Sequence, residues 1–267
     1  MGLFNENVRM GASAAGTYEI ERSLRFNSDD SPKLSRSWSG DDGNLKTQTY
    51  SFWFKRGNDS QGYIFTAWNN SNTDRIGILS DSQFFVELKD GGSTEAEWHS
   101  KRVLKDESAW YHAVVAFDTT QATETNRFKV WINGELITEW DTYNAVSQDY
   151  QLDGFGRANK THVIGAYASG SSTTSGHFDG YITEFHYLDG VAATASDFAE
   201  TNPITGQWVP KKYGGSYGSK GWYLNFSDNS DVTDATLGAD SSGNGNNWTP
   251  ANLSVSSGAS NDSYIDT

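Results

Sequence analysis

"WYHAVVAFD", residues 110 to 118, is the stretch that decides the fold. Successive side chains of a β-strand point to opposite faces, so Trp110 and His112 share one face and Tyr111 and Val115 take the other. Both faces carry apolar residues, which is typical of a strand buried on two sides. We expect Trp110 to pack between two sheets, with His112 hydrogen-bonded beside it at the domain rim. A structural role for His112 is favoured, since a lone strand histidine lacks the partners of a metal ligand or a catalytic base.

The composition limits the class of protein. The chain has 267 residues, 27 glycines, 14% aromatic residues, no cysteine and a net charge of −14. Disulfides and thiolate metal sites are excluded, and an acidic surface makes nucleic acid an unsuitable partner. No apolar run is long enough to insert into a membrane. The first residues lack the pattern of a signal peptide, so we expect synthesis in a cytoplasm.

Strand-like runs joined by turns continue on both sides of the opening stretch. Asn133-Gly134 separates two such runs and predicts a hairpin, because both turn positions need positive φ. Residues 192–200, "AATASDFAE", form the one stretch typical of a short helix, with Thr194 or Ser196 as its cap. The strand and turn spacing predicts an all-β fold, a two-sheet antiparallel β-sandwich.

The sequence pattern divides the chain into three predicted segments. Residues 1–20 form an N-terminal arm or attachment segment, residues 21–200 the sandwich, and residues 201–267 a Gly/Ser/Asn-rich extension. "GWYLNFSDNS" from Gly221 echoes "ERSLRFNSDD" from Glu21, which hints at a second similar unit. The extension is therefore either a linker with the start of a second β unit or a segment that packs on the first.

Five segments in order carry a resemblance: "SLRFN", "YSFWFKR", "WYHAVVAFD", "FKVWINGELI" and "FDGYITEFHYLDG". They resemble the laminin-G-like branch of the concanavalin A-like lectin/glucanase superfamily over residues 21–200, which implies a jelly-roll sandwich. "GQWVPKKYGGSYGSKGWYLNFSD" and "DSSGNGNNWTP" are similar to segments of bacteriophage tail-fibre and other virion surface proteins. That second resemblance implies a place on the surface of a phage particle assembled in the host cytoplasm.

The glucanase branch of the same fold tests the enzyme hypothesis. Its carboxylates lie on one strand in a Glu-x-Asp-x-Glu type run, which the period of two places on one face. The nearest approaches in this chain are Glu19-Ile-Glu21 and Glu95-Ala-Glu97, and both lack the central aspartate. We therefore expect a protein that is not an enzyme.

Ca²⁺ is the one cofactor that the resemblance implies, since members of the superfamily often bind it through loop oxygens. The candidate ligands lie in two oxygen-rich turns, Asp29 and Asp30 in the first and Asp228 and Asp231 in the second. Calcium needs six to eight oxygens from several loops, and solvated Asx turns are the alternative interpretation.

Sugar binding needs aromatic faces beside amide and carboxylate groups. Two stretches have that character, "TAWNNSNTD" and "TEAEWHSKR". The candidate carbohydrate-binding residues are Trp68, Asn69, Asn70, Asn72, Asp74, Trp98, His99 and Tyr167. The alternative is that these aromatic residues only cover an edge of the sandwich.

The sequence leaves three functions open. The first is a lectin-like virion surface protein, in a tail fibre or on the capsid, that adheres to host glycans. We expect a homo-oligomer, with a trimer implied by the resemblance, because multiple copies would add avidity. The second is a structural decoration or joint that contacts other virion proteins without binding sugar. A glycan-cleaving enzyme is the third and least favoured.

Overall fold

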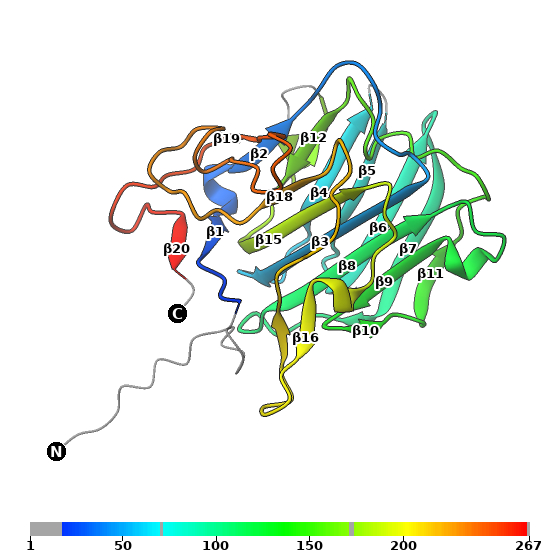
Figure 1. Ribbon diagram of the computed structural model, residues 1–267, viewed down its shortest axis with the longest axis horizontal. Helices are drawn as coiled ribbons and strands as arrows, with labels where there is room; N and C mark the ends of the chain where they lie inside the picture. The colour runs from blue at the N-terminus through cyan, green and yellow to red at the C-terminus, as the bar shows by residue number, and fades with distance from the viewer. Residues whose placement is uncertain (1–17, 70–71, 171–173, 266–267) are drawn as a thin grey trace.

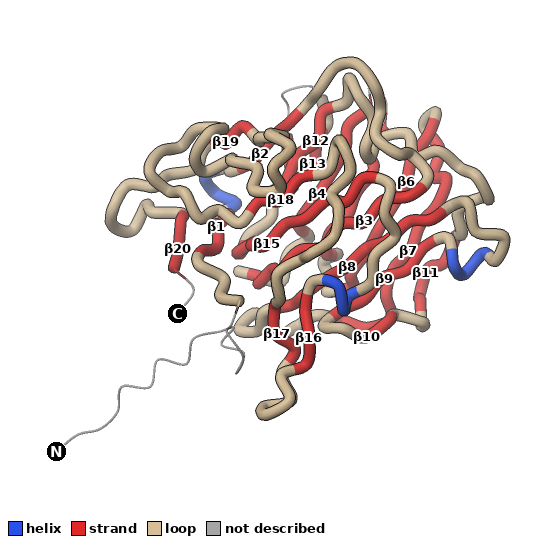
Figure 2. Tube along the Cα trace, viewed as in Figure 1, coloured by secondary structure: helices blue, strands red, loops and turns tan. Residues whose placement is uncertain are grey.

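The chain folds into two face-to-face antiparallel sheets, seen in a computed structural model that describes residues 18–69, 72–170 and 174–265 (Figure 1). Within these residues, helix is limited to three single 3₁₀ turns (Figure 2). They are η1 (Ser28–Asp30), η2 (Glu124–Asn126) and η3 (Ala195–Asp197). The all-β prediction and the two-sheet antiparallel sandwich are confirmed.

Sheet A has the strand order β10-β9-β8-β3-β15-β1-β20, and β18 also pairs with β15. Its strands are β1 (Arg22–Phe26), β3 (Thr47–Arg56), β8 (Tyr111–Asp118), β9 (Phe128–Ile132), β10 (Glu135–Leu136), β15 (Gly180–Asp189), β18 (Trp222–Leu224) and β20 (Ser263–Ile265).

Sheet B has the strand order β11-β7-β6-β5-β4-β12-β2-β19. Its strands are β2 (Lys33–Arg36), β4 (Gly62–Asn69), β5 (Asn72–Ile78), β6 (Gln83–Asp90), β7 (Ser93–Val103), β11 (Trp140–Asn144), β12 (Thr161–Ile164) and β19 (Thr249–Ala251). Two small hairpins lie outside the sheets, β13 (Tyr167–Ala168) with β14 (Thr174–Ser175), and β16 (Ala199–Thr201) with β17 (Trp208–Pro210).

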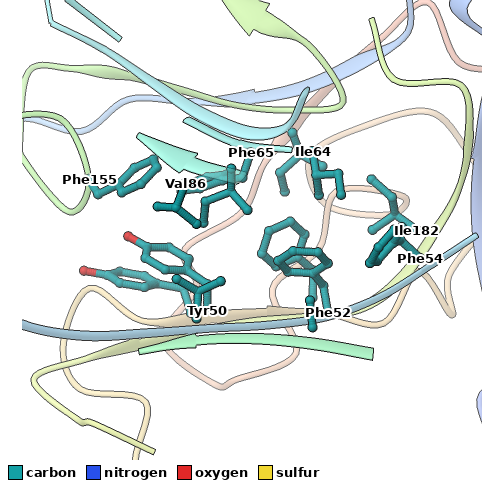
Figure 3. Packing of buried hydrophobic residues seen from close by; sticks show 14 of the residues in the cluster. Tyr50, Phe52, Phe54, Ile64, Phe65, Val86, Phe155 and Ile182 are labelled. Atoms are coloured by element: carbon teal, nitrogen blue, oxygen red, sulfur yellow. The ribbon is translucent and has the colours of Figure 1, made fainter. Parts of the chain in front are cut away.

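Aromatic rings fill the space between the sheets. Tyr50, Phe52 and Phe54 are alternate residues of β3 and point the same way, toward the opposite sheet (Figure 3). The Tyr50 ring lies 4.9 Å from Phe65 and 5.4 Å from Phe155, centroid to centroid. Removal of this apolar area from water is the main source of stability for such a sandwich.

The opening stretch forms β8, and its alternation is confirmed. Tyr111, Val115 and Phe117 belong to the core between the sheets, whereas Val114 belongs to a second apolar cluster on the outer face of sheet A. Trp110 is partly buried and packs in a third cluster away from the main core. The prediction that Trp110 lies between the sheets is wrong, because strand periodicity fixes which residues share a face but not which face meets the other sheet.

His112 is wholly buried on the outer face of sheet A, beneath β17. The indole N–H of Trp208 can only donate, and it donates to His112 Nδ1 over 3.1 Å. The proton of the ring is therefore on Nε2, which donates to Ser51 Oγ over 2.9 Å. Burial lowers the pKa of His112 to about 3, so the neutral ring is a structural element of the fold.

The predicted Asn-Gly hairpin is confirmed. Asn133 and Gly134 join β9 to β10, with φ angles of 50° and 82°. The predicted helix over residues 192–200 is reduced to η3, a single 3₁₀ turn followed by β16. Thr194 precedes η3, and its N–H and hydroxyl both donate to the Asp197 carboxylate.

The chain after residue 200 contributes strands to both sheets. β18 pairs with β15 next to β1, so the two echoing segments lie along the same edge of one strand. β20 pairs with β1 in sheet A, and β19 pairs with β2 in sheet B. Trp222 and Trp248 from this segment are buried in the main core. The sandwich core is therefore built from both parts of the chain.

Candidate functional site

The predicted sugar-binding residues lie in different surroundings, and two of them, Trp98 and Asp74, are buried. Trp98 is fully buried, and its ring stacks on Phe128 with centroids 3.7 Å apart. Glu97 and His99, on either side of Trp98 in β7, point away from the core. The indole therefore points between the sheets, where a sugar cannot reach it. The prediction for Trp98 is wrong.

Asp74 is also unavailable to a ligand, since only 1% of it is exposed. Its carboxylate accepts N–H groups from Lys89, Gly154 and Phe155 over 2.9, 2.9 and 3.0 Å. Burial raises the pKa of Asp74 to about 7, while the three backbone donors act in the opposite direction. Asp74 is a clamp that ties β5 to β6 and to the loop at residue 154, and its prediction as a binding residue is wrong.

Tyr167 and His99 lie on the outer face of sheet B. Tyr63 links them, because its ring centroid is 5.0 Å from Tyr167 and 5.9 Å from Phe85, which in turn lies 6.1 Å from His99. His99 Nε2 also lies 2.9 Å from a carboxylate oxygen of Glu97. On the same face, Arg75 and Lys89 both pair with the Glu87 carboxylate.

Trp68 is partly buried and packs against a small apolar cluster of Val163, Ala166 and Ala168. It therefore lies beside Tyr167 at the β13 hairpin, and the two predicted rings share one side of the molecule. Asn70 lies outside the described residues, as do the side chains of Asn69 and Asn72. The sugar-site prediction on this side stays a prediction for Trp68, His99 and Tyr167.

The calcium candidates take part in local turns. Asp30 accepts a hydrogen bond from Asn27 over 2.7 Å, Asp228 accepts the N–H of Ser230 over 3.0 Å, and Asp231 accepts the next backbone N–H, while Asp29 is exposed in η1. In the described segments, no three His, Asp or Glu side chains are grouped so as to hold a metal ion. Calcium binding stays a prediction.

A different site emerges on the outer face of sheet A, where β15 contains a β-bulge. The pairing of β15 with β3 shifts register between Thr183 and His186, and Glu184 has a φ of 50°. Ile182 and Phe185 both face the core, although strict alternation would place Glu184 there with Ile182. The bulge moves Glu184 to the outer face beside His186. Bulges and strained backbone of this kind concentrate at functional sites.

Glu184 is held by two tyrosines from distant parts of the chain. Its Oε2 accepts the hydroxyl of Tyr18, and its Oε1 accepts that of Tyr223 over 2.7 Å. The two hydroxyl oxygens lie 2.5 Å apart. Burial raises the pKa of Glu184 to about 7, against the opposing effect of the tyrosine hydrogen bonds.

A pocket of about 650 Å³ opens above this group. It is lined by aromatic rings, charged groups and small polar groups, namely Tyr18, Tyr213, Tyr217, Tyr223 and His186; Glu19, Glu21 and Lys212; and Asn225, Ser241 and Ser242. We call it the tyrosine pocket. Its volume lies in the range of small-molecule sites.

The rings of the tyrosine pocket are held in place by one another. Tyr223 stacks on His186 with centroids 4.1 Å apart and planes 4° apart, and Tyr217 lies nearly parallel to both. Tyr213 stands at 74° to Tyr217, 5.2 Å away. His186 is neutral because burial lowers its pKa to about 3, and its Nδ1 lies 3.0 Å from the Tyr217 hydroxyl. Fixed rings beside hydroxyls, an amide and carboxylates are the chemistry that recognises a polyhydroxylated ligand.

Two signals in the sequence point to this pocket, although the predicted site residues did not include it. In "YITEFHY", residues 181–187, the apolar positions Ile182 and Phe185 break the period of two, which is the mark of a bulge at Glu184. In "KKYGGSYGSKGWY", Tyr213, Tyr217 and Tyr223 recur in a stretch that otherwise resembles a linker. Glu19 and Glu21 were set aside because they lack the central aspartate of a glucanase run, yet both line the pocket.

The fold and the site define a concanavalin A-like β-sandwich with a lateral pocket. The model of the concanavalin A-like lectin/glucanase superfamily matches residues 26–197, and the chain belongs to this family, in agreement with the laminin-G-like resemblance. No curated protein matches the sequence. No helix in the described segments has the length and apolar character needed to cross a membrane.

Solved structures share the fold at low identity. A heptameric SAP-like pentraxin from Limulus polyphemus is 18% identical with a TM-score of 0.51, and the match covers 74% of this chain and 94% of that one. A protein from Bacteroides ovatus, whose description proposes carbohydrate binding, is 15% identical with a TM-score of 0.52. That match covers 88% of this chain and 62% of the Bacteroides chain. These two structures share the fold of this chain, and membership of the family supports a role in binding sugars or proteins.

Proposed function

We propose that this chain is a non-catalytic carbohydrate-binding protein and that the tyrosine pocket is its binding site. One observation carries the proposal: the β15 bulge, the start of the described chain and the extension converge to hold Tyr18, Tyr217 and Tyr223 around a pocket of about 650 Å³. Aromatic faces stack on the C–H faces of a sugar ring, while the rim hydroxyls and amide exchange hydrogen bonds with its hydroxyls.

A glycan array with the purified protein, followed by calorimetry on the best ligand, tests the proposal. Tyr213→Ala removes a ring that lines the pocket, and we expect it to weaken binding about tenfold, equivalent to about 1.4 kcal/mol. Tyr143→Ala is the matched control, because Tyr143 is 43% exposed on β11 of the other sheet. Full affinity in the Tyr213 variant, with loss in Trp68→Ala or Tyr167→Ala, would instead place the sugar on the outer face of sheet B.

The non-catalytic part of the proposal rests on the surroundings of Glu184. A retaining glycosidase needs two carboxylates free to reach the scissile bond, about 5 to 5.5 Å apart. Glu184 is 4% exposed, and each of its oxygens accepts a tyrosine hydroxyl. We expect no release of reducing sugar from any glycan that binds. Release that is lost in Glu184→Gln or Glu21→Gln would make the protein an enzyme.

We further propose that the protein acts on a phage particle, where it adheres to host glycans as an oligomer. The support is the resemblance of residues 206–250 to tail-fibre and virion surface proteins, the acidic charge and the gain in avidity from several copies. Immunogold labelling of purified particles with an antibody to this chain tests the location. Particles without label, with the protein found free in the lysate, would contradict it.

One observation favours the second candidate, a joint between proteins of the particle. The β16–β17 hairpin projects from the body of the molecule (Figure 1), and Ile204 at its tip is 76% exposed. Exposed apolar side chains of this kind mark protein contacts. An Ile204→Asp variant that binds glycans normally but fails to join particles would support a joint function alongside sugar binding.

A further inference from the structure

The charge around the tyrosine pocket selects the kind of ligand it can accept. Glu19 and Glu21 line the pocket from one stretch of chain, where both are exposed while Ile20 between them is buried. Glu184 lies beneath the rings, and Lys212 is the one positively charged side chain among the lining residues, because His186 is neutral. The whole chain also carries a net charge of −14. The electrostatic potential in the pocket is therefore negative, which repels acidic sugars and attracts a cation.

Among the described residues, Glu184 has no charged partner of opposite sign. In the described segments, its one ion-pair contact is with His186, whose Nε2 lies 3.9 Å from Oε2. The buried His186 ring is neutral, so this contact leaves the carboxyl without a cation. An isolated charge in the interior costs free energy, and with a pKa of about 7 Glu184 is partly protonated near neutral pH, so a cation above it would favour the ionised carboxylate. The pocket above Glu184 is the place from which a ligand could supply one.

The floor of the pocket presents oxygen atoms that can accept hydrogen bonds. The Tyr18 and Tyr223 hydroxyls contact Glu184 and each other, and each hydroxyl oxygen retains a lone pair that can accept a hydrogen bond from a ligand. A ligand group that donates several hydrogen bonds and carries positive charge fits this arrangement. The Tyr213 and Tyr217 rings, whose planes lie 74° apart, line the pocket, and an aromatic face presented there attracts a cation.

We propose that the tyrosine pocket binds the ammonium group of an amine-bearing glycan, such as one built from hexosamine units without N-acetyl groups. This inference rests on the proposed carbohydrate-binding function and names its ligand class. The ammonium group would lie against the tyrosine faces and donate to the hydroxyls polarised by Glu184, with Glu19 and Glu21 at the rim.

Calorimetry at neutral pH with two matched probes tests the inference. The probes are a pentamer of β-1,4-linked glucosamine and the same pentamer with every amine N-acetylated. We expect the amine form to bind about tenfold more tightly than the acetylated form. Glu184→Gln should remove most of that difference and leave the acetylated form unaffected.

Two exposed positions keep the test decisive if Glu184→Gln does not fold. Glu21→Gln should weaken binding of the amine form, while Lys212→Gln should strengthen it, because Lys212 repels the ligand cation. Glu107→Gln, at an exposed loop position outside the pocket, controls for non-specific attraction of a cation to an acidic protein.

The outcomes separate the two proposals. Equal binding of both pentamers, or tighter binding by the Glu21 variant with weaker binding by the Lys212 variant, would overturn the ammonium inference while the carbohydrate-binding function stands. If neither pentamer nor any glycan on the array binds, the carbohydrate-binding function itself fails.

Discussion

At the scale of single residues, burial decides the role of a polar side chain more than its chemical type does. Asp74 and Glu184 are both buried carboxylates with a pKa raised to about 7. Asp74 is saturated by three backbone N–H groups of the protein, so it stabilises the fold. Glu184 is held by two side chains that themselves line a pocket, so it can act on a ligand through them.

Asp74→Ala should lower the free energy of unfolding by about 3 kcal/mol or more, because three buried N–H groups lose their acceptor. Denaturant unfolding measures the change. Asp228→Ala is the control, since Asp228 is exposed in a local turn with Ser230, and we expect no measurable loss of stability for it. Similar losses at both positions would contradict the clamp role of Asp74.

At the scale of elements, the β9–β10 hairpin and the β16–β17 hairpin depend on each other. A β-carbon at Gly134 would lie 2.8 Å from the Trp208 ring, and the same Trp208 donates to His112 on β8. The tight Asn-Gly turn thus leaves room for the indole that fastens β17 to sheet A. The sequence pattern predicted the turn but not the ring that lies over it.

Gly134→Ala should destabilise the protein by roughly 1 to 3 kcal/mol, from positive φ together with the contact to Trp208. Gly243→Ala is a matched control, because Gly243 has a φ of 92°, while a β-carbon there would meet no atom of the described residues within 4 Å. The difference between the two variants in thermal unfolding isolates the Trp208 contact. Equal losses would mean that backbone strain alone is responsible.

At the scale of the whole molecule, the sandwich and its extension form one core. Trp222 and Trp248 pack against each other at 4.8 Å and belong to the same buried cluster as Phe52 of β3. The extension also supplies Tyr223 to the tyrosine pocket. Stability and the proposed binding site therefore both need the chain beyond residue 200.

Trp248→Ala should cost about 3 to 5 kcal/mol, as much as Phe52→Ala, since both leave a cavity in one shared core. Denaturant unfolding followed by tryptophan fluorescence and by circular dichroism should give a single coincident transition in the unaltered protein. Two separate transitions, with Trp248→Ala affecting only one, would show that the extension unfolds as an independent unit.

Stability should depend on pH through five buried groups. His112, His162 and His186 have a pKa lowered to about 3 by burial, so the unfolded chain takes up protons that the folded chain excludes as pH falls below 6.5. Asp74 and Glu184, with a pKa raised to about 7, act in the opposite direction as pH rises toward 7. The three histidines outweigh the two carboxyls by one proton. The free energy of unfolding should therefore rise by about 1.4 kcal/mol per pH unit between about pH 4.5 and 6.5.

His162→Phe tests this balance, because it removes one of the three histidine contributions. In the variant, the free energy of unfolding should be nearly independent of pH over that interval. Urea unfolding at a series of pH values measures this slope. An unchanged slope in the variant would contradict a neutral, buried His162.

The sequence by itself determined the β-sandwich, the Asn133-Gly134 turn and the sharing of faces along β8, because these depend on local φ preferences and on the period of two. It did not determine which face of β8, or of β7, meets the other sheet, which is why Trp110 and Trp98 were assigned to the wrong surroundings. The tyrosine pocket depends on a bulge that reverses the direction of Glu184, and on Tyr18 and Tyr223, which lie 205 positions apart in the chain. Only the tertiary structure could bring them together, because strand pairing between distant segments leaves no periodic trace in the sequence.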